Sequence, residues 1–168
     1  SNLQFTCADP ELANAFPEVF FARSTPIQYG LHNGQQWHDW FTSLGLADTR
    51  SRTKFIPATV WSWDEQSIGE LIAGLAVTDG SWWVSTDGEH HFEFVSSSRQ
   101  LIEDFRRLAG IRLGIWGSTI TQGSKGTLCV SYGTREALEK LAALPINGRK
   151  QALAEIAIPK RNSKSSHV

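Results

Sequence analysis

An acidic residue ends an apolar helical pattern in the middle of the chain, at Asp79-Gly80 within "LIAGLAVTDGSWW" (71–83). A carboxylate at the C-terminal end of a helix is disfavoured, because the helix dipole already places partial negative charge there. A compensating partner is therefore expected. A divalent cation is the obvious candidate, since its charge offsets both the carboxylate and the dipole. The position of Asp79 thus predicts metal chemistry.

Basic residues are gathered in three clusters, although the formal net charge of the chain is only −1. The clusters are Arg50, Arg52 and Lys54; Arg106, Arg107 and Arg112; and the tail from Arg149 to Val168. A solvated surface is the simpler interpretation of any one cluster. Three clusters beside similar elements favour contacts to phosphate groups, because the distribution of charge matters more than its sum.

A helix from about Glu65 to Thr78 must place this acid, and Ser62 or Asp64 is expected to cap it. Its sequence carries one stripe of large apolar residues and a second stripe of small residues. The stripes are Ile68, Leu71, Ile72 and Leu75, and Gly69, Ala73, Gly74 and Val77. Small residues allow another backbone to approach closely. The second stripe therefore predicts pairing with a similar helix, without which apolar surface would face water.

The elements around this helix occur twice in the chain. The segment "LQFTCADPELANAF" (3–16) aligns without a gap to "FEFVSSSRQLIEDF" (92–105), each with a strand followed by a helix. The segments 27–46 and 127–146 then match as strand, turn and helix, and each copy ends in a basic corner, at 49–54 or 147–150. A hairpin with its turn near Asp87-Gly88 adds a strand to the second copy. The pattern predicts a pseudo-twofold α+β protein.

This organisation divides the chain into a first pseudo-repeat over residues 1–60, a second with the motif helix over 61–158, and a basic tail over 159–168. With 40% hydrophobic and 20% charged residues, the chain is expected to be globular. Two cysteines suit a reducing compartment, and no apolar run is long enough to cross a bilayer. We therefore expect an intracellular protein, in the cytoplasm or nucleus, with no membrane partner.

The segment "IAGLAVTDG" (72–80) resembles the signature of the LAGLIDADG, or dodecapeptide, homing endonucleases. The flanking segments "KFIP" (54–57) and "FEFVSSSRQLIEDFRRLAGIRLGI" (92–115) resemble the intein-encoded and single-chain branch of that family, and the resemblance extends from about Leu3 to Ile156. It implies αββαββ-type halves whose motif helices pack at a pseudo-twofold axis. Each motif helix ends in an acid, and antiparallel sheets lie in the major groove of DNA.

The resemblance also implies roles for individual residues. Asp79 falls on the metal-binding acid, and Lys54 and Lys150 fall on basic active-site residues, with Mg²⁺ or Mn²⁺ as cofactor. Phosphodiester hydrolysis needs these groups, since metal and cations stabilise the charge that develops on the phosphate. Double-stranded DNA is the implied partner, bound through phosphate and base contacts. The residues expected at that interface are Arg50, Arg52, Ser85, Glu89, His91, Ser118, Thr119, Thr121, Gln122, Lys125, Ser131 and Arg149.

The function implied is site-specific, metal-dependent cleavage of double-stranded DNA, of the kind that mobilises inteins or introns. The repeat places the counterpart of Asp79 upstream of Ser1, so a single copy of the chain is expected to hold half an active site. A fragment carrying the first motif helix, or a second copy of the chain, is the expected partner. The alternative function is a degenerate scaffold of this family that binds nucleic acid without cleaving it.

Three further patterns have simpler explanations. In "WHDW" (37–40), a His-Asp pair lacks a recognisable nucleophile, and Trp37 and Trp40 at helical spacing predict core positions. His90-His91 beside Glu89 is a poor metal site, because adjacent residues on a strand face opposite sides. "GSKGT" (123–127) predicts a turn between strands. Four other tryptophans fit either the core or a groove: Trp61, Trp63, Trp82 and Trp83.

Overall fold

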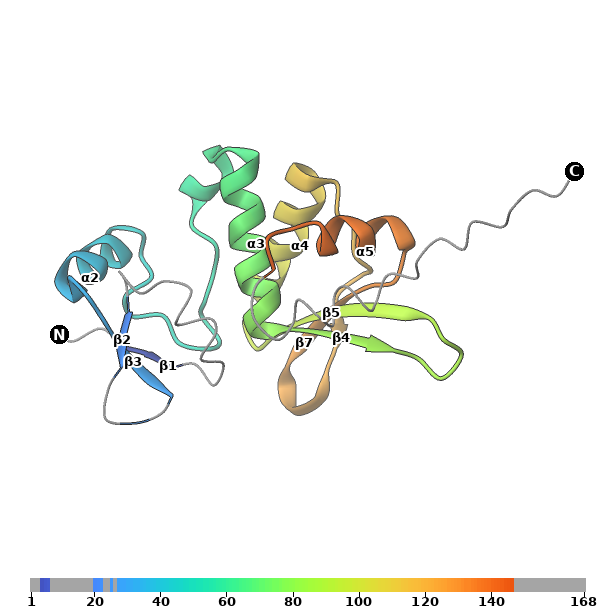
Figure 1. The fold of residues 1–168 in the computed structure, drawn as a ribbon, viewed down its shortest axis with the longest axis horizontal. Helices are drawn as coiled ribbons and strands as arrows, with labels where there is room; N and C mark the ends of the chain where they lie inside the picture. The colour runs from blue at the N-terminus through green and yellow to red at the C-terminus, as the bar shows by residue number, and fades with distance from the viewer. Residues whose placement is uncertain (1–3, 7–19, 23–24, 26, 147–168) are drawn as a thin grey trace, which may run out of the picture.

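The computed structural model describes residues 4–6, 20–22, 25 and 27–146 (Figure 1). Lys150, Arg149, the tail 159–168 and the helix expected near residues 9–16 lie outside these ranges. The first repeat contains three strands and one helix among its described residues. They are β1 (Gln4–Thr6), β2 (Phe20–Ala22), β3 (Gln28–Leu31) and α2 (Gly34–Ser43). The predicted turn at Asn33-Gly34 is confirmed, with Asn33 in the left-handed conformation before α2.

The second repeat, with the short helix that leads into it, runs to the end of the described residues. Its elements are η1 (Ala58–Ser62), α3 (Glu65–Asp79), β4 (Gly80–Val84), β5 (His90–Ser96), α4 (Arg99–Leu113), β6 (Thr121–Gln122), η2 (Ser124–Gly126), β7 (Leu128–Tyr132) and α5 (Arg135–Ala142). The predicted helix over 65–78, the β4–β5 hairpin and the turn at 123–127 are confirmed. Asp64 caps α3 by accepting a hydrogen bond from the Ser67 N–H at 2.8 Å.

The two repeats have the same strand order. The first forms a three-stranded antiparallel sheet in the order β1-β3-β2, and the second forms a four-stranded antiparallel sheet in the order β4-β5-β7-β6. Strands β1 and β5 lie in one pair of aligned segments and β3 and β7 in the other, and β2 and β6 stand between them in the chain. In each repeat β3 or β7 therefore lies between the two strands that precede it in this order. The α+β fold and the duplication predicted from the sequence are confirmed at this level.

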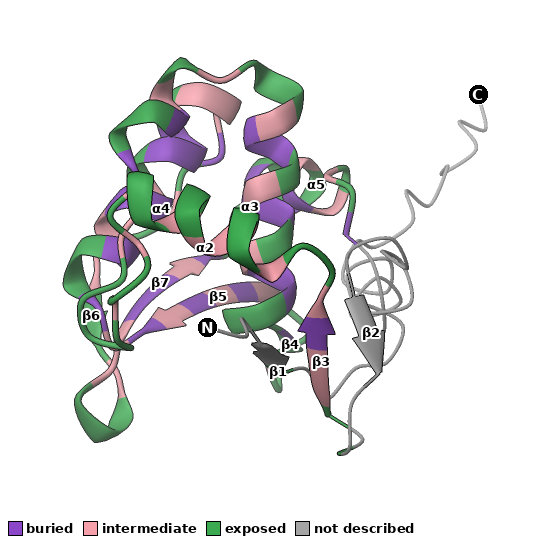
Figure 2. Cartoon of the chain, turned by 90° about the vertical axis from the view of Figure 1, so that its left-hand side faces the viewer, coloured by how far each residue is buried: buried purple, intermediate pink, exposed green. Residues whose placement is uncertain are grey.

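The core lies between the second sheet and its helices. Phe92 and Phe94 of β5 and Tyr132 of β7 are buried beneath α3 and α4, and the Phe94 ring stacks on Phe105 with centroids 3.9 Å apart. Figures 1 and 2 show α3, α4 and α5 on one side of this sheet. The alternate residues of each strand therefore face away from the helices, on a surface that we call the outer face.

The segment that leads into α3 is fastened to α4. The Ser98 hydroxyl donates to the Lys54 carbonyl at 2.5 Å, and the buried Asp104 carboxylate accepts from the Ile56 N–H at 3.0 Å. Arg112 donates to the carbonyls of Trp61 and Trp63, the second at 2.9 Å. We call these contacts the linker latch. They fix the start of α3, and with it the direction in which its far end points.

The structure corrects the prediction for the small-residue stripe of α3. Gly69, Ala73 and Val77 are buried within this chain, and only Gly74 of the four is exposed. The reason is that α4 and the sheet pack against the side of α3 that holds Ile68 and Ile72, and the three small residues adjoin that side. The predicted open strip of Ala73, Gly74 and Val77 therefore does not exist in this form.

The core position predicted for Trp37 and Trp40 is also wrong. No residue of α2 is buried, and the Trp40 side chain is 43% exposed. The two indoles contact each other edge to face at 5.8 Å, so their helical spacing produced a contact on the helix surface. Within the described part of the chain, no helix has the length and apolar character needed to cross a membrane.

Candidate functional site

Asp79 is the last residue of α3, and its carboxylate is exposed where the helix meets β4. The backbone continues directly into the strand, with the Gly80 N–H donating to the Ala76 carbonyl. A side chain at position 80 is excluded, because a Cβ would clash with the Ala76 oxygen and lie 2.5 Å from the Phe92 ring. The Asp-Gly pair therefore has a physical reason. The glycine allows helix and strand to meet, and the acid is held at the junction.

Lys54 lies at the same end of the sheet as Asp79. Gly80 at the start of β4 pairs with Phe94 near the end of β5. Ser97 and Ser98, which follow β5, donate hydrogen bonds to the carbonyls of Ser51 and Lys54. Arg50, Arg52 and Lys54 are all exposed. The first basic cluster is thus placed at the same end of the sheet as the helix-end acid.

The second basic cluster is engaged within the protein. Arg106 donates to the Ser118 carbonyl at 2.7 Å, and the Arg107 guanidinium lies 5.7 Å from the centre of the Trp61 ring. Arg112 belongs to the linker latch. These three arginines hold loops against α4, which is a structural role.

The outer face of the second sheet forms a regular grid of side chains. Cross-strand pairing aligns Ser81 of β4, Glu93 of β5 and Ser131 of β7 in a central row. One flanking row holds Trp83 and His91, whose rings stack with centroids 4.3 Å apart and planes 18° apart. The other flanking row holds Val95, Cys129 and Thr121. The surface combines polar, aromatic and apolar groups, as base contacts in a DNA groove require.

The predicted interface residues of the second repeat fall at different positions around this face. His91, Thr121 and Ser131 lie on the outer face itself, and Ser118 joins it through two hydrogen bonds with the Ser131 backbone, at 2.8 and 3.1 Å. Four others lie at its borders, in the hairpin turn, in η2 or along the chain that leads into β6: Ser85, Glu89, Thr119 and Lys125. Gln122, the last residue of β6, pairs with Leu128 and therefore alternates to the opposite side of the sheet.

The sequence analysis missed several residues of the outer face. Ser81, Glu93, Val95 and Cys129 were not singled out, and Trp83 fitted either the core or a groove. The alternation of Phe92 and Phe94 with their neighbours was the available signal, because a strand with two phenylalanines on one side must present residues 91, 93 and 95 on the other.

The outer face carries little positive charge. Glu93 lies at its centre, and the Glu89 carboxylate lies 4.0 Å from the His91 ring. In the hairpin turn the Ser85 hydroxyl donates to Asp87 and lowers the pKa of that carboxyl, so Asp87 is ionised. Burial raises the pKa of the Cys129 thiol, so the residue is a neutral thiol at pH 7. Base contacts suit this face better than phosphate contacts.

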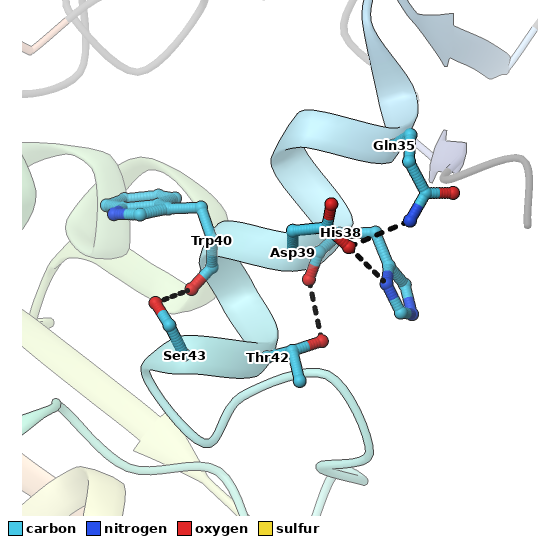
Figure 3. A network of polar contacts seen from close by, with 6 residues as sticks. All are labelled: Gln35, His38, Asp39, Trp40, Thr42 and Ser43. Carbon is cyan, nitrogen blue, oxygen red and sulfur yellow. Dashed lines mark hydrogen bonds and ion pairs between the residues drawn. The ribbon is translucent and has the colours of Figure 1, made fainter.

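The His-Asp pair on α2 has no catalytic geometry (Figure 3). The His38 ring nitrogen lies 3.7 Å from the Asp39 carboxylate, and the neighbouring hydroxyls are turned to the backbone. Thr42 donates to the His38 carbonyl and Ser43 to the Trp40 carbonyl, each at 2.7 Å. Neither of these hydroxyls, the two that the structure shows beside the pair, is turned towards the imidazole as a catalytic nucleophile would be.

The chain combines an acid at the end of a helix, an antiparallel sheet that starts directly after it, and a second, smaller antiparallel sheet in the first repeat. This combination defines an α+β protein with a repeated order of elements. The model of the LAGLIDADG-like domain matches residues 67–153, just over half of the chain. The chain therefore belongs to the LAGLIDADG family. The resemblance noted from the sequence is confirmed.

Other known proteins are similar to part of this chain. The replicative DNA helicase DnaB of Rhodothermus marinus is 30% identical over 149 residues, which cover 83% of this chain but only 15% of the helicase. Two solved structures are similar at 18% identity. The homing endonuclease I-CvuI in complex with its target has a TM-score of 0.42, with 56% of this chain and 65% of that chain covered. The meganuclease I-SmaMI bound to uncleavable DNA has a TM-score of 0.41, with 70% and 41% covered.

Asp79 suits a divalent ion by the chemistry of its donors. An exposed carboxylate offers hard oxygen ligands, and the last turn of α3 has no basic residue to neutralise it. Mg²⁺ typically takes one or two carboxylates and fills its remaining positions with water and phosphate oxygens. Within the described part of the chain, no three His, Cys, Asp or Glu side chains form a group that could hold a metal. Asp79 therefore fits as one ligand of a site that other oxygen donors complete.

Proposed function

We propose that this chain is a site-specific, double-stranded DNA endonuclease domain of homing type that hydrolyses phosphodiester bonds. The observation that carries the proposal is the position of Asp79, exposed at the junction between the motif helix and the outer sheet face. Membership of the LAGLIDADG family supports it. DNA lying along the outer face would bring a phosphate to this junction. We also propose an intracellular location, where DNA is available.

The exposed residues of such a site have different roles. Lys54 supplies a cation to the charge that develops on the phosphate, and Arg50 and Arg52 hold neighbouring phosphates, which positions the duplex. The outer face contacts base edges and selects the sequence. Asp79 holds a divalent ion, Mg²⁺ or Mn²⁺. When bound, such an ion offsets phosphate charge and acidifies a water molecule.

We propose further that the domain belongs to an intein or a similar mobile element. What supports this is that its likeness to the replicative helicase spans 149 residues and only 15% of that protein. A domain that forms a small part of a much longer protein suits an element inserted into a host gene. The uninterrupted form of such a gene is then the natural substrate.

The proposed experiment incubates the purified chain and Mg²⁺ with a plasmid that carries an uninterrupted replicative helicase gene. We expect cleavage at one position. Asp79→Asn should reduce it by at least about a hundredfold, because several kcal/mol of transition-state stabilisation are lost with the metal ligand. Glu65→Gln, which changes an exposed acid in the first turn of the same helix, is the matched control and should cut normally.

Two results would overturn parts of this proposal. Cleavage that survives Asp79→Asn would remove the role of Asp79. Specific binding without any cleavage, in the presence of Mg²⁺ or Mn²⁺, would favour the alternative function, a scaffold that binds nucleic acid without cutting it. A binding assay on the same DNA separates that outcome from an absence of DNA recognition.

A further inference from the structure

Glu93 lies at the centre of the outer face, in the row between Ser81 and Ser131. It is half-buried, and its carboxylate accepts a hydrogen bond from the Ser131 hydroxyl at 3.2 Å. Ser131 is itself fixed, because its backbone N–H donates to the Ser118 hydroxyl at 3.1 Å and its carbonyl accepts from the Ser118 N–H at 2.8 Å. One oxygen of the carboxylate is therefore engaged by a residue whose backbone is fixed, on the face of the sheet that points away from the helices.

The surroundings of Glu93 leave its negative charge uncompensated. Trp83 and His91 stack on each other on one side, and Val95 and Cys129 lie on the other. Among residues 27–146, none of the ion pairs involves Glu93. A carboxylate at this place repels phosphate, so it weakens binding of DNA unless a hydrogen-bond donor of the DNA meets it.

The chemistry of base edges selects that donor. An ionised carboxylate only accepts hydrogen bonds. In the major groove, guanine presents two acceptors, thymine an acceptor and a methyl group, and adenine an acceptor beside its amino donor. Cytosine alone presents a donor without an acceptor, its N4 amino group. A carboxylate at the centre of a DNA-binding face is thus matched to cytosine.

We propose that Glu93 is a specificity-determining residue that accepts a hydrogen bond from the N4 amino group of one cytosine in the target. Ser131 is a positioning residue that holds the carboxylate for this contact. The inference rests on the proposed function, since it requires DNA on the outer face, but it does not require cleavage. It names one base in a target sequence that is otherwise undefined.

The test selects bound duplexes from a library of randomised double-stranded DNA with the full chain, without Mg²⁺, and sequences them. The selected duplexes should share one position that is almost always cytosine. In a direct binding assay, changing that C·G pair to T·A should lower the affinity of the wild-type protein for the duplex about tenfold or more. Glu93→Gln should move the preference at this position alone towards adenine, because glutamine pairs with the adenine N6 and N7 atoms.

Two further variants separate this role from a structural one. Ser131→Ala should keep cytosine at the position but reduce the discrimination, as expected when a positioning contact is lost. Glu139→Gln, on the exposed surface of α5, should select the same sequences as the wild type. Selected sequences that Glu93→Gln leaves unchanged would overturn the role of Glu93 and leave the proposed function intact. A library from which the wild type enriches nothing would overturn DNA recognition itself.

Discussion

Position 80 shows how much of the site depends on one missing side chain. The end of α3 and the start of β4 pass close to the Phe92 ring, and there is no room for a Cβ atom at position 80. Its backbone angles, φ −91° and ψ 159°, are available to any residue. The constraint is therefore steric. Gly74, six residues earlier on the same helix, faces open space instead, and a Cβ added there would have nothing within 4 Å.

Alanine at these two glycines should have opposite effects on stability. Gly80→Ala forces a methyl group against the Ala76 carbonyl and the Phe92 ring, and should lower the free energy of unfolding by about 1–3 kcal/mol or more. Gly74→Ala should raise it by about 0.5–1 kcal/mol, because alanine restricts the unfolded chain and is the better helix former. Urea denaturation followed by circular dichroism measures both. Equal effects of the two substitutions would contradict the steric explanation.

At the scale of elements, the boundaries of α3 were predictable and its orientation was not. Asp64 at the start and Gly80 after the end are local signals, and the structure confirms them. Gly69 and Gly74 belong to the same stripe in sequence, yet one is buried near Leu144 and the other is exposed. The difference arises from where α4 and the sheet lie. That depends on contacts between residues far apart in the sequence, which helical spacing does not contain.

The candidate site divides in the same way. Asp79 was predictable because the helix, the acid and the glycine are adjacent in the sequence. Glu93 was not, because its importance depends on pairing with Ser131, which lies on a different strand. Trp82 and Trp83 are neighbours in the sequence, but the pleat of β4 buries the first and leaves the second 40% exposed. Only the register between strands decides which residues share the outer face.

The linker latch is an element-scale feature that can be tested through Asp104. Asp104→Ala removes the acceptor of the buried Ile56 N–H and of the Gln100 amide, so the free energy of unfolding should fall by about 1–3 kcal/mol. Glu103→Ala, which affects only an exposed i,i+4 pair with Arg99, should change stability by less than about 0.5 kcal/mol. Thermal or urea denaturation distinguishes the two variants. A similar small effect for both would mean that water replaces the Asp104 contact.

At the scale of the whole molecule, α3 keeps one side uncovered by the rest of the described chain. Glu70, Gly74 and Thr78 are exposed on it, and Leu71 and Leu75 are only partly buried. This surface is narrower than the sequence suggested, because three of the small residues turn inward. It still offers apolar side chains beside a glycine, which suits close approach by a second helix. Pairing there would bring a second acid towards Asp79.

We therefore expect the chain to self-associate through this side of α3. Light scattering should show a mass that rises with concentration towards a dimer, and Gly74→Leu should keep the chain monomeric by blocking close approach. The substitution should leave the fold intact, since the space at Gly74 is open. Glu139→Leu adds the same side chain to the exposed surface of α5 and should not alter association. A wild-type protein that is monomeric at every concentration, with Gly74→Leu identical to it, would contradict self-pairing.

The linker latch also has a consequence for the order in which the molecule folds. Its hydrogen bonds join residues 44 to 51 positions apart, whereas the turn of the β4–β5 hairpin joins Ser85 to Glu89. Closing a long loop has the larger entropic cost and follows the faster local events. We therefore expect the latch to form after the hairpin turn when the chain folds. Lys54 and the two arginines before it are exposed on the segment that the latch fastens, so contacts with α4, far away in the sequence, set where these cations lie relative to the sheet.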